Sequence, residues 1–220
     1  MSAPAFDVLR MPLDLLALDA WLAVGRPEPH EAPGRTWREW WSVRELIRRQ
    51  DPADPVIAPG DVVARADRGA GDGRPDFLLF RGTARFAVEA TIAGTTEDLD
   101  EDDEFRSAVN VHELISRRGG RFADGALGDE WEVAMAADIA RAAEAKRGKV
   151  YAPGAVLLVH CRSNAMMADP AGVAAHLSRH GDAAPFREVV ALVPGGALIR
   201  WAGRRVGLFA PARATESPRP

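Results

Sequence analysis

Cysteine is nearly absent from this chain, in which Cys161 is the only one among 220 residues. A single cysteine excludes a disulfide within the chain and a cysteine-rich zinc site, because each of these needs two or more thiols. Positive charge is not in excess either, since 28 Lys and Arg stand against 32 Asp and Glu. This balance argues against a protein that coats nucleic acid non-specifically, although it is compatible with a local basic cleft.

Long apolar runs are also missing, so the sequence predicts no transmembrane helix. The N-terminal segment carries Asp7, Asp14 and Asp19 and has no basic start, which is unlike a signal peptide. We therefore predict a cytoplasmic protein that does not associate with a membrane. The length suits one domain, and apolar residues, at 47%, are numerous enough to build its core.

The chain begins with helical patterns. Residues 6–24 predict an amphipathic helix. Thr36 is a candidate N-cap for a second helix, with Glu39 three residues later as in a capping box. The predicted apolar face of the first helix consists of Leu9, Leu13, Leu16 and Ala20.

Short apolar runs and helical patterns make up most of the remaining chain, which is typical of an α/β domain. We expect a helical part, 1–50, to pack on this domain, 51–210, and a disordered tail to follow over 211–220. Strands are predicted within 61–67, 155–161, 186–193, 196–203 and 205–211, and helices over 105–118, 130–147 and 171–181.

The segment 74–91, RPDFLLFRGTARFAVEAT, predicts a β-hairpin with one carboxylate in each strand. Gly82-Thr83 has the composition of a two-residue type II′ turn, which would pair residues whose numbers add up to 165. Asp76 would then lie opposite Glu89, with a Cβ separation of about 5 Å. Two like charges opposed among apolar side chains are destabilising, so this register calls for a positive charge between them.

A divalent metal ion would supply that charge. Mg²⁺, or Mn²⁺ in its place, prefers a few carboxylates together with water and phosphate oxygens. A metal held in this way polarises a phosphodiester and lowers the pKa of a bound water. In the alternative interpretation, Asp76 caps the start of its strand after Pro75, and Glu89 is an edge residue that faces water. The residues alone leave both interpretations open.

The PDF…VEAT pattern resembles the PD-(D/E)xK nuclease superfamily, which has the restriction-endonuclease-like fold. The resemblance implies a central mixed β-sheet flanked by helices, with Asp76 and Glu89 as metal ligands and the backbone carbonyl of Ala90 as a third. In that superfamily a helix and another core strand follow the second catalytic strand. Residues 130–161 could supply both after an insertion.

The chain departs from the motif at Thr91, where the superfamily has a lysine that assists the attacking water. In some members a basic residue on a neighbouring element replaces that lysine. Lys146 falls at the next turn of an apolar stripe on the predicted helix 130–147, and it is our candidate for the replacement. The alternative role for Lys146 is a helix C-terminal cation with a snorkelling stem. The stripe consists of Trp131, Met135, Ile139 and Ala142.

Other charged residues are assigned supporting roles. The superfamily often has a glutamate on its first helix near the metal, and Glu45 is the better match because it lies one turn from Trp41, whereas Glu39 is expected to cap. In the alternative interpretation either glutamate is a solvated helix position. The acidic run from Glu97 to Glu104 is predicted to be a solvated loop or helix start. The candidate DNA contacts are Arg117, Arg118, Arg121 and Lys149.

Three hypotheses about function follow. The first is a Mg²⁺- or Mn²⁺-dependent nuclease that hydrolyses DNA phosphodiester bonds, in which Asp76 and Glu89 hold the metal and Lys146 positions water or stabilises charge. The second is a catalytically inactive binding or scaffold protein of the same fold with a protein partner, and Thr91 is its best support. A homodimer is compatible with either. The third is an unrelated α/β protein whose carboxylates face solvent.

Overall fold

A computed structural model describes residues 6–26, 34–66, 74–93, 130–147, 154–161, 168–193 and 196–209 of the protein. Its strands are β1 (Val8–Arg10), β2 (Val62–Arg65), β3 (Phe77–Arg81), β4 (Ala84–Ala93), β5 (Val156–Cys161), β6 (Glu188–Leu192), β7 (Leu198–Ala202) and β8 (Arg205–Phe209). Its helices are α1 (Leu15–Val24), α2 (Arg35–Arg49), α5 (Glu130–Arg147) and α6 (Pro170–Leu177).

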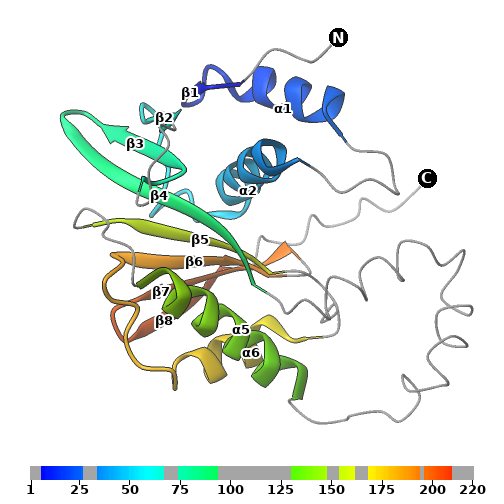
Figure 1. Ribbon diagram of the computed structural model, residues 1–220, viewed down its shortest axis with the longest axis vertical. Helices are drawn as coiled ribbons and strands as arrows, with labels where there is room; N and C mark the ends of the chain where they lie inside the picture. The colour runs from blue at the N-terminus through cyan, green and yellow to red at the C-terminus, as the bar shows by residue number, and fades with distance from the viewer. Residues whose placement is uncertain are drawn as a thin grey trace, which may run out of the picture.

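The eight described strands form one mixed sheet, in which the order in space follows the order in the chain (Figure 1). β1 to β4 are antiparallel neighbours, β4, β5 and β6 run parallel, and β6 to β8 are again antiparallel. Parallel neighbours need a crossover connection, and α5 and α6 lie in the two crossovers. The predicted α/β class with a mixed sheet is therefore confirmed.

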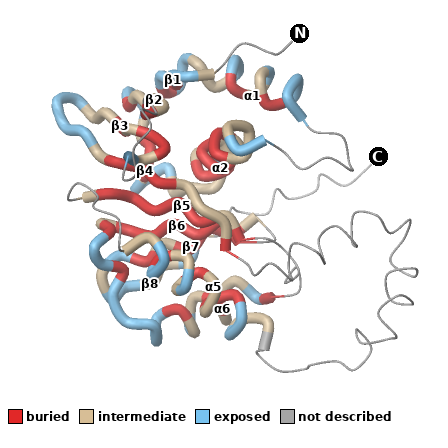
Figure 2. Tube along the Cα trace, viewed as in Figure 1, coloured by how far each residue is buried: buried red, intermediate tan, exposed pale blue. Residues whose placement is uncertain are grey.

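Helices cover both faces of the sheet, with α1 and α2 on one face and α5 and α6 on the other (Figure 1). Successive side chains of a strand point to opposite faces, so β5 contributes to two cores. Leu158 belongs to the core that contains Trp40 of α2, whereas Leu157 belongs to the core that contains Ile139 of α5. Figure 2 shows β5 and β6 as mostly buried, which explains the apolar runs at 156–159 and 189–192.

The predicted hairpin is confirmed together with its register. Phe77 lies opposite Val88, and Leu79 lies opposite Phe86. Gly82 has a φ of +58° and Thr83 does not have a positive φ, which is the combination that a type II′ turn requires. The turn itself is exposed (Figure 2), so its backbone preference, more than its packing, sets the register.

The predicted helix over 6–24 is wrong at its start, because residues Val8–Arg10 form strand β1. Within β1 only Leu9 is buried, and it pairs with Val63 of β2. Helix α1 begins at Leu15, after Pro12. The residue before a proline is disfavoured in the helical region, which separates the strand from the helix.

The apolar face predicted for this first helix is also wrong. Leu13 and Leu16 are 80% and 82% exposed, whereas Leu18 and Leu22 are buried against the core. Leucine and alanine occur on all sides of this segment. Apolar spacing therefore does not identify the face that meets the sheet.

The second predicted helix is confirmed as α2, but its predicted cap is wrong. α2 begins at Arg35, with Gly34 as the N-cap, so Thr36 lies inside the first turn. Glu39 does not complete a capping box with Thr36, because its Oε1 accepts a hydrogen bond from Arg35 Nε at 2.6 Å. Arg35 and Glu39 are four residues apart, a spacing at which helix side chains form ion pairs.

The remaining elements that lie in the described ranges are confirmed, among them α5, α6 and the C-terminal strands. The helix predicted over 105–118 and the tail predicted over 211–220 lie outside the described residues. Among the helices that the structure does describe, none has the length and apolar character needed to cross a membrane.

The N-cap of α6 gives a first testable prediction. Asp169 Oδ2 accepts a hydrogen bond from Gly172 N at 3.2 Å, and Pro170 is the first helical residue. We expect Asp169→Ala to lower the free energy of unfolding by about 1 kcal/mol, measured by urea denaturation. Asp169→Asn keeps an acceptor and is expected to lose less. An equal loss in both variants would contradict the capping role.

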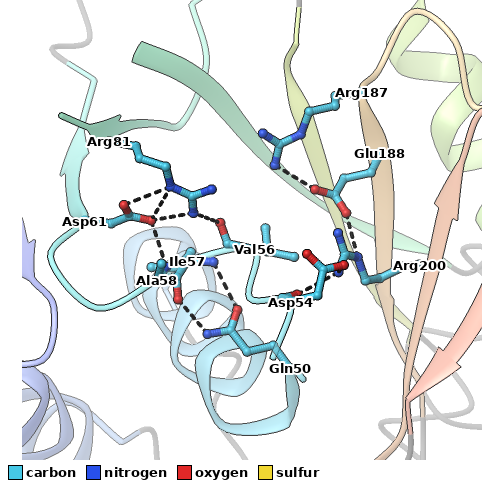
Figure 3. A network of polar contacts seen from close by, with 10 residues as sticks. All are labelled: Gln50, Asp54, Val56, Ile57, Ala58, Asp61, Arg81, Arg187, Glu188 and Arg200. Carbon is cyan, nitrogen blue, oxygen red and sulfur yellow. Dashed lines mark hydrogen bonds and ion pairs between the residues drawn. The ribbon is translucent and has the colours of Figure 1, made fainter. Parts of the chain in front are cut away.

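Buried ion pairs hold the segment between α2 and β2 near the sheet (Figure 3). Asp61 is 3% exposed and accepts hydrogen bonds from Arg81, the shortest at 2.7 Å. This hydrogen bond raises the pKa of Arg81 above its ordinary value. Glu188 of β6 is 2% exposed and accepts a hydrogen bond at 2.7 Å from each of Arg187 and Arg200. Buried carboxylates at this end of the sheet are thus matched by arginines.

Candidate functional site

Asp76 directly precedes β3, and its side chain is only 3% exposed. Its Oδ2 accepts a hydrogen bond from Ala90 N of β4 at 2.9 Å, and its Oδ1 accepts one from Arg35 Nη2 of α2 at 2.9 Å. β4 continues past the position opposite the first residue of β3. Beyond that point the Asp76 carboxylate takes the place of a strand carbonyl as the acceptor for Ala90 N–H. This hydrogen bond fixes the position of the carboxylate.

Glu89 lies within β4, between β3 and β5, and is 1% exposed. Ala87 and Ala93 are an even number of residues from Glu89 along β4, and both belong to the core on the α5 side. Side chains alternate along a strand, so Glu89 faces α5 as well. Its Oε1 accepts a hydrogen bond from Lys146 Nζ at 2.6 Å. The strand alternation and the helix stripe together bring these two charges into contact.

The structure thus places the two predicted carboxylates at neighbouring positions. Phe77 pairs with Val88. Asp76 is the residue before Phe77, and Glu89 is the residue after Val88, so both acids are adjacent to this pair. Both side chains are buried. The interpretations in which Glu89 or both carboxylates face solvent are therefore wrong.

Lys146 is the predicted replacement for the missing lysine of the motif, and it lies at the C-terminal end of α5. Met135 and Ile139 of the predicted stripe are buried, which turns this side of α5 toward the sheet. The Lys146 side chain is 18% exposed and its ammonium pairs with Glu89. Thr91 lies two residues after Glu89 on the same face of β4, so the face that lacks a lysine at 91 receives one from α5.

Arg35 links Asp76 to a second buried carboxylate of α2. Its Nε donates to Glu39 Oε1 at 2.6 Å, and its Nη2 donates to Asp76 Oδ1 at 2.9 Å. Arg65 Nη2 lies 3.4 Å from the other oxygen of Glu39. The hydrogen bond to Glu39 is the main reason that the pKa of Arg35 is raised, and the charge of Asp76 acts in the same direction.

Sequence reasoning missed Arg35 and gave Glu39 a capping role. The only sequence signal was their spacing of four residues, which is common to many exposed ion pairs. Contact with Asp76 arises from the packing of α2 over the sheet, and no local pattern predicts it.

Glu45, the predicted first-helix acid, lies in a different environment from Asp76. Its Oε2 accepts from Arg48 at 2.9 Å and pairs with Arg49 at 2.7 Å. Arg49 in turn donates to Val193 O beyond the end of β6. The carboxylate of α2 that shares an arginine with Asp76 is Glu39. Both glutamates are buried, at 5% and 9% exposure for Glu39 and Glu45.

The predicted DNA contacts lie outside the described residues, and so does the acidic run from Glu97 to Glu104. These contacts are Arg117, Arg118, Arg121 and Lys149.

The donor set agrees in kind with a hard divalent cation. Asp76 and Glu89 provide carboxylate oxygens, and Ala90, which is joined to Glu89, provides a backbone carbonyl. Within the described ranges, no cluster of three or more His, Cys, Asp or Glu side chains is arranged to bind a metal. An ion here would therefore take further ligands from water or phosphate oxygens, as Mg²⁺ usually does.

His160 and Cys161 are the last two residues of β5. The His160 ring lies 4.7 Å from the Trp41 ring, on the α2 side. Cys161 is buried in the core on the α5 side. Burial raises the pKa of the Cys161 thiol far above its ordinary value, which disfavours the thiolate needed for nucleophilic chemistry.

Comparison of the chain with protein-family models, curated proteins and solved structures found no match.

Proposed function

We propose that the protein is a metal-dependent nuclease that hydrolyses DNA phosphodiester bonds. The observation that carries the proposal is the 2.6 Å contact between Lys146 Nζ and Glu89 Oε1. It joins a lysine to the second carboxylate of a motif whose own lysine position holds Thr91. Asp76 is tied to the residue after Glu89 by the hydrogen bond from Ala90 N. An acid, a second acid and a lysine therefore gather around one segment of β4.

The order of elements supports a restriction-endonuclease-like arrangement for the domain. β3 carries the first acid at its start, β4 carries the second, and α5 and β5 follow. β5 is parallel to β4, with Leu157 opposite Glu89. A helix and a further core strand after the second catalytic strand are what the resemblance to the PD-(D/E)xK superfamily implies.

The proposed roles follow from the contacts. Asp76, Glu89 and the carbonyl of Ala90 would hold Mg²⁺ or Mn²⁺, which supplies charge neutralisation and a more acidic bound water when present. Lys146 is held by Glu89 and carries a positive charge that can orient a water or stabilise charge developing on a phosphoryl oxygen. Burial of both carboxylates strengthens each of these electrostatic interactions.

The proposal is tested with the unmodified protein. Supercoiled plasmid DNA is expected to be nicked in Mg²⁺ or Mn²⁺ and to remain intact in EDTA, because cleavage depends on the metal. Titration calorimetry is expected to detect binding of Mn²⁺ by the protein alone. If the protein cuts neither single- nor double-stranded DNA with either metal and binds no Mn²⁺, the proposal fails.

A second candidate is a binding or scaffold protein that has this fold without catalysis. The contact between Arg35 and Asp76 favours it, because this cation already neutralises one of the two acids. The Lys146 ammonium does the same for Glu89, so both buried charges are balanced by the protein itself. Failure of metal binding in the calorimetric test would favour this candidate.

A further inference from the structure

The Arg35 guanidinium has unused hydrogen-bonding capacity beside the candidate site. A guanidinium has five N–H donors. Arg35 uses Nε toward Glu39 and one N–H of Nη2 toward Asp76. Its two Nη1 donors and the second Nη2 donor make no hydrogen bond within the described part of the chain. Three of the five donors therefore remain for a further acceptor.

The accessibility of Arg35 contrasts with that of its partners. Its side chain is 63% exposed, whereas the side chains of Glu39 and Asp76 are 6% and 3% exposed. Two buried carboxylates thus fix the orientation of a guanidinium that remains open to solvent. Arginine held in this way is suited to bidentate recognition of a phosphate, since little conformational freedom is lost when the ligand binds.

The location of Arg35 is not explained by the stability of α2. Arg35 is the first residue of the helix, where the positive end of the helix dipole disfavours a cation. Its pair with Glu39 has the arginine on the N-terminal side, which is the weaker orientation of a pair four residues apart. Arg74, two residues before Asp76, is exposed on the same stretch of chain and adds positive charge there.

We propose that Arg35 contacts a backbone phosphate of the nucleic acid substrate and positions it next to Asp76. This inference rests on the proposed function, because it takes DNA as the ligand. It concerns binding and not the chemical step, so Arg35 acts as a positioning residue for the phosphodiester. The ligand is a phosphate of the nucleic acid backbone, and a contact to it does not depend on the base sequence.

The test measures binding of a short fluorescein-labelled DNA by anisotropy in EDTA, where metal-dependent cleavage does not occur. Arg35→Gln is expected to weaken binding by about tenfold or more, because a charge-assisted contact is lost. It is also expected to reduce the slope of log affinity against log salt by about 1. Duplex and single-stranded DNA are compared as separate arms, and the loss is expected in whichever form the protein binds.

Arg48→Gln is the matched control. Arg48 lies on the same helix, is 59% exposed and pairs with the buried carboxylate of Glu45. Its replacement removes the same charge at a distance from Asp76 and is expected to change the affinity by less than about twofold. If Arg35→Gln loses no more affinity than Arg48→Gln, or if the wild-type protein binds neither DNA form, the inference is overturned.

A second variant separates binding from folding. Arg35→Lys keeps the charge that neutralises Asp76 and Glu39 but loses the planar fork, so we expect it to remain folded and to bind DNA less tightly than wild type. Wild-type affinity in folded Arg35→Lys would contradict the proposal. DNA binding that depends on Arg35 without any cleavage in Mg²⁺ would overturn the nuclease proposal alone.

Discussion

Glu89→Gln is expected to reduce metal-dependent DNA cleavage by about a hundredfold or more, because the amide cannot supply a charged metal ligand. Asp76→Asn is expected to have a similar effect. Lys146→Met should lower the cleavage rate by about 10²- to 10⁴-fold, the range of a general acid–base or charge-stabilising group. The measurement is the rate of plasmid nicking per folded protein in Mg²⁺.

The control for these variants is Glu188→Gln. Glu188 is a carboxylate of the same sheet, 2% exposed and paired with arginines, but it lies on β6 and has no contact with Asp76 or Glu89 among the hydrogen bonds and ion pairs described. Glu188→Gln should retain cleavage after correction for any loss of folded protein. Equal losses in Glu188→Gln and Glu89→Gln would mean that activity reports only on folding.

Stability measurements separate a catalytic Lys146 from a structural one. Lys146→Met alone leaves the Glu89 carboxylate without its ammonium and is expected to cost about 3–5 kcal/mol of unfolding free energy. The double variant Glu89→Gln/Lys146→Met removes both charges and should recover much of that loss. It should not recover cleavage. Recovery of both stability and cleavage in the double variant would mean that Glu89 and Lys146 form only a structural ion pair.

Trp40→Ala is expected to lower the free energy of unfolding by about 3–5 kcal/mol, which makes it the most destabilising apolar substitution that we predict. Trp40 is fully buried on the α2 side of the sheet. Its ring lies 5.0 Å from Phe6 and 4.7 Å from Phe77, both in edge-on arrangements. Alanine would leave a cavity between α2 and β3, and guanidinium denaturation measures the loss.

Trp40→Phe serves as the conservative comparison. The Trp40 Nε1 is buried and has no hydrogen-bond partner in the described part of the protein. Phenylalanine keeps an aromatic ring and removes this unsatisfied donor, so the expected cost is below about 1.5 kcal/mol. A loss of less than 1 kcal/mol in Trp40→Ala, on the order of a surface change, would show that this core relaxes around the site.

Local sequence predicted the parts of the fold that local backbone preferences determine. Gly82 adopts the positive φ of its turn, and the hairpin register follows from it. The apolar stripe on α5 predicted that Lys146 faces the sheet, because burial of Met135 and Ile139 turns this side of the helix toward the sheet. The contact between Lys146 and Glu89 then follows from two periodicities that can both be read from the chain.

The parts that sequence did not predict depend on contacts between distant segments. Leu9 joins a strand because β2 offers an edge to pair with, and nothing near Leu9 indicates this. Arg35 meets Asp76 across 41 positions of the chain. Glu39 was assigned a cap because Thr36 and Arg35 both precede it at suitable spacings, and local spacing does not choose between a capping box and an ion pair.

The order of the strands in the sheet has a consequence for folding kinetics. The hairpins β3–β4 and β7–β8 close through turns of two residues and can form on the microsecond timescale. Pairing of β4 with β5 joins Glu89 to Leu157, a long-range contact that is intrinsically slower. Lys146 lies in the crossover between these two strands. Partly folded chains would therefore contain the hairpin and its carboxylates before they contain the lysine, and an incompletely folded protein would lack the assembled site.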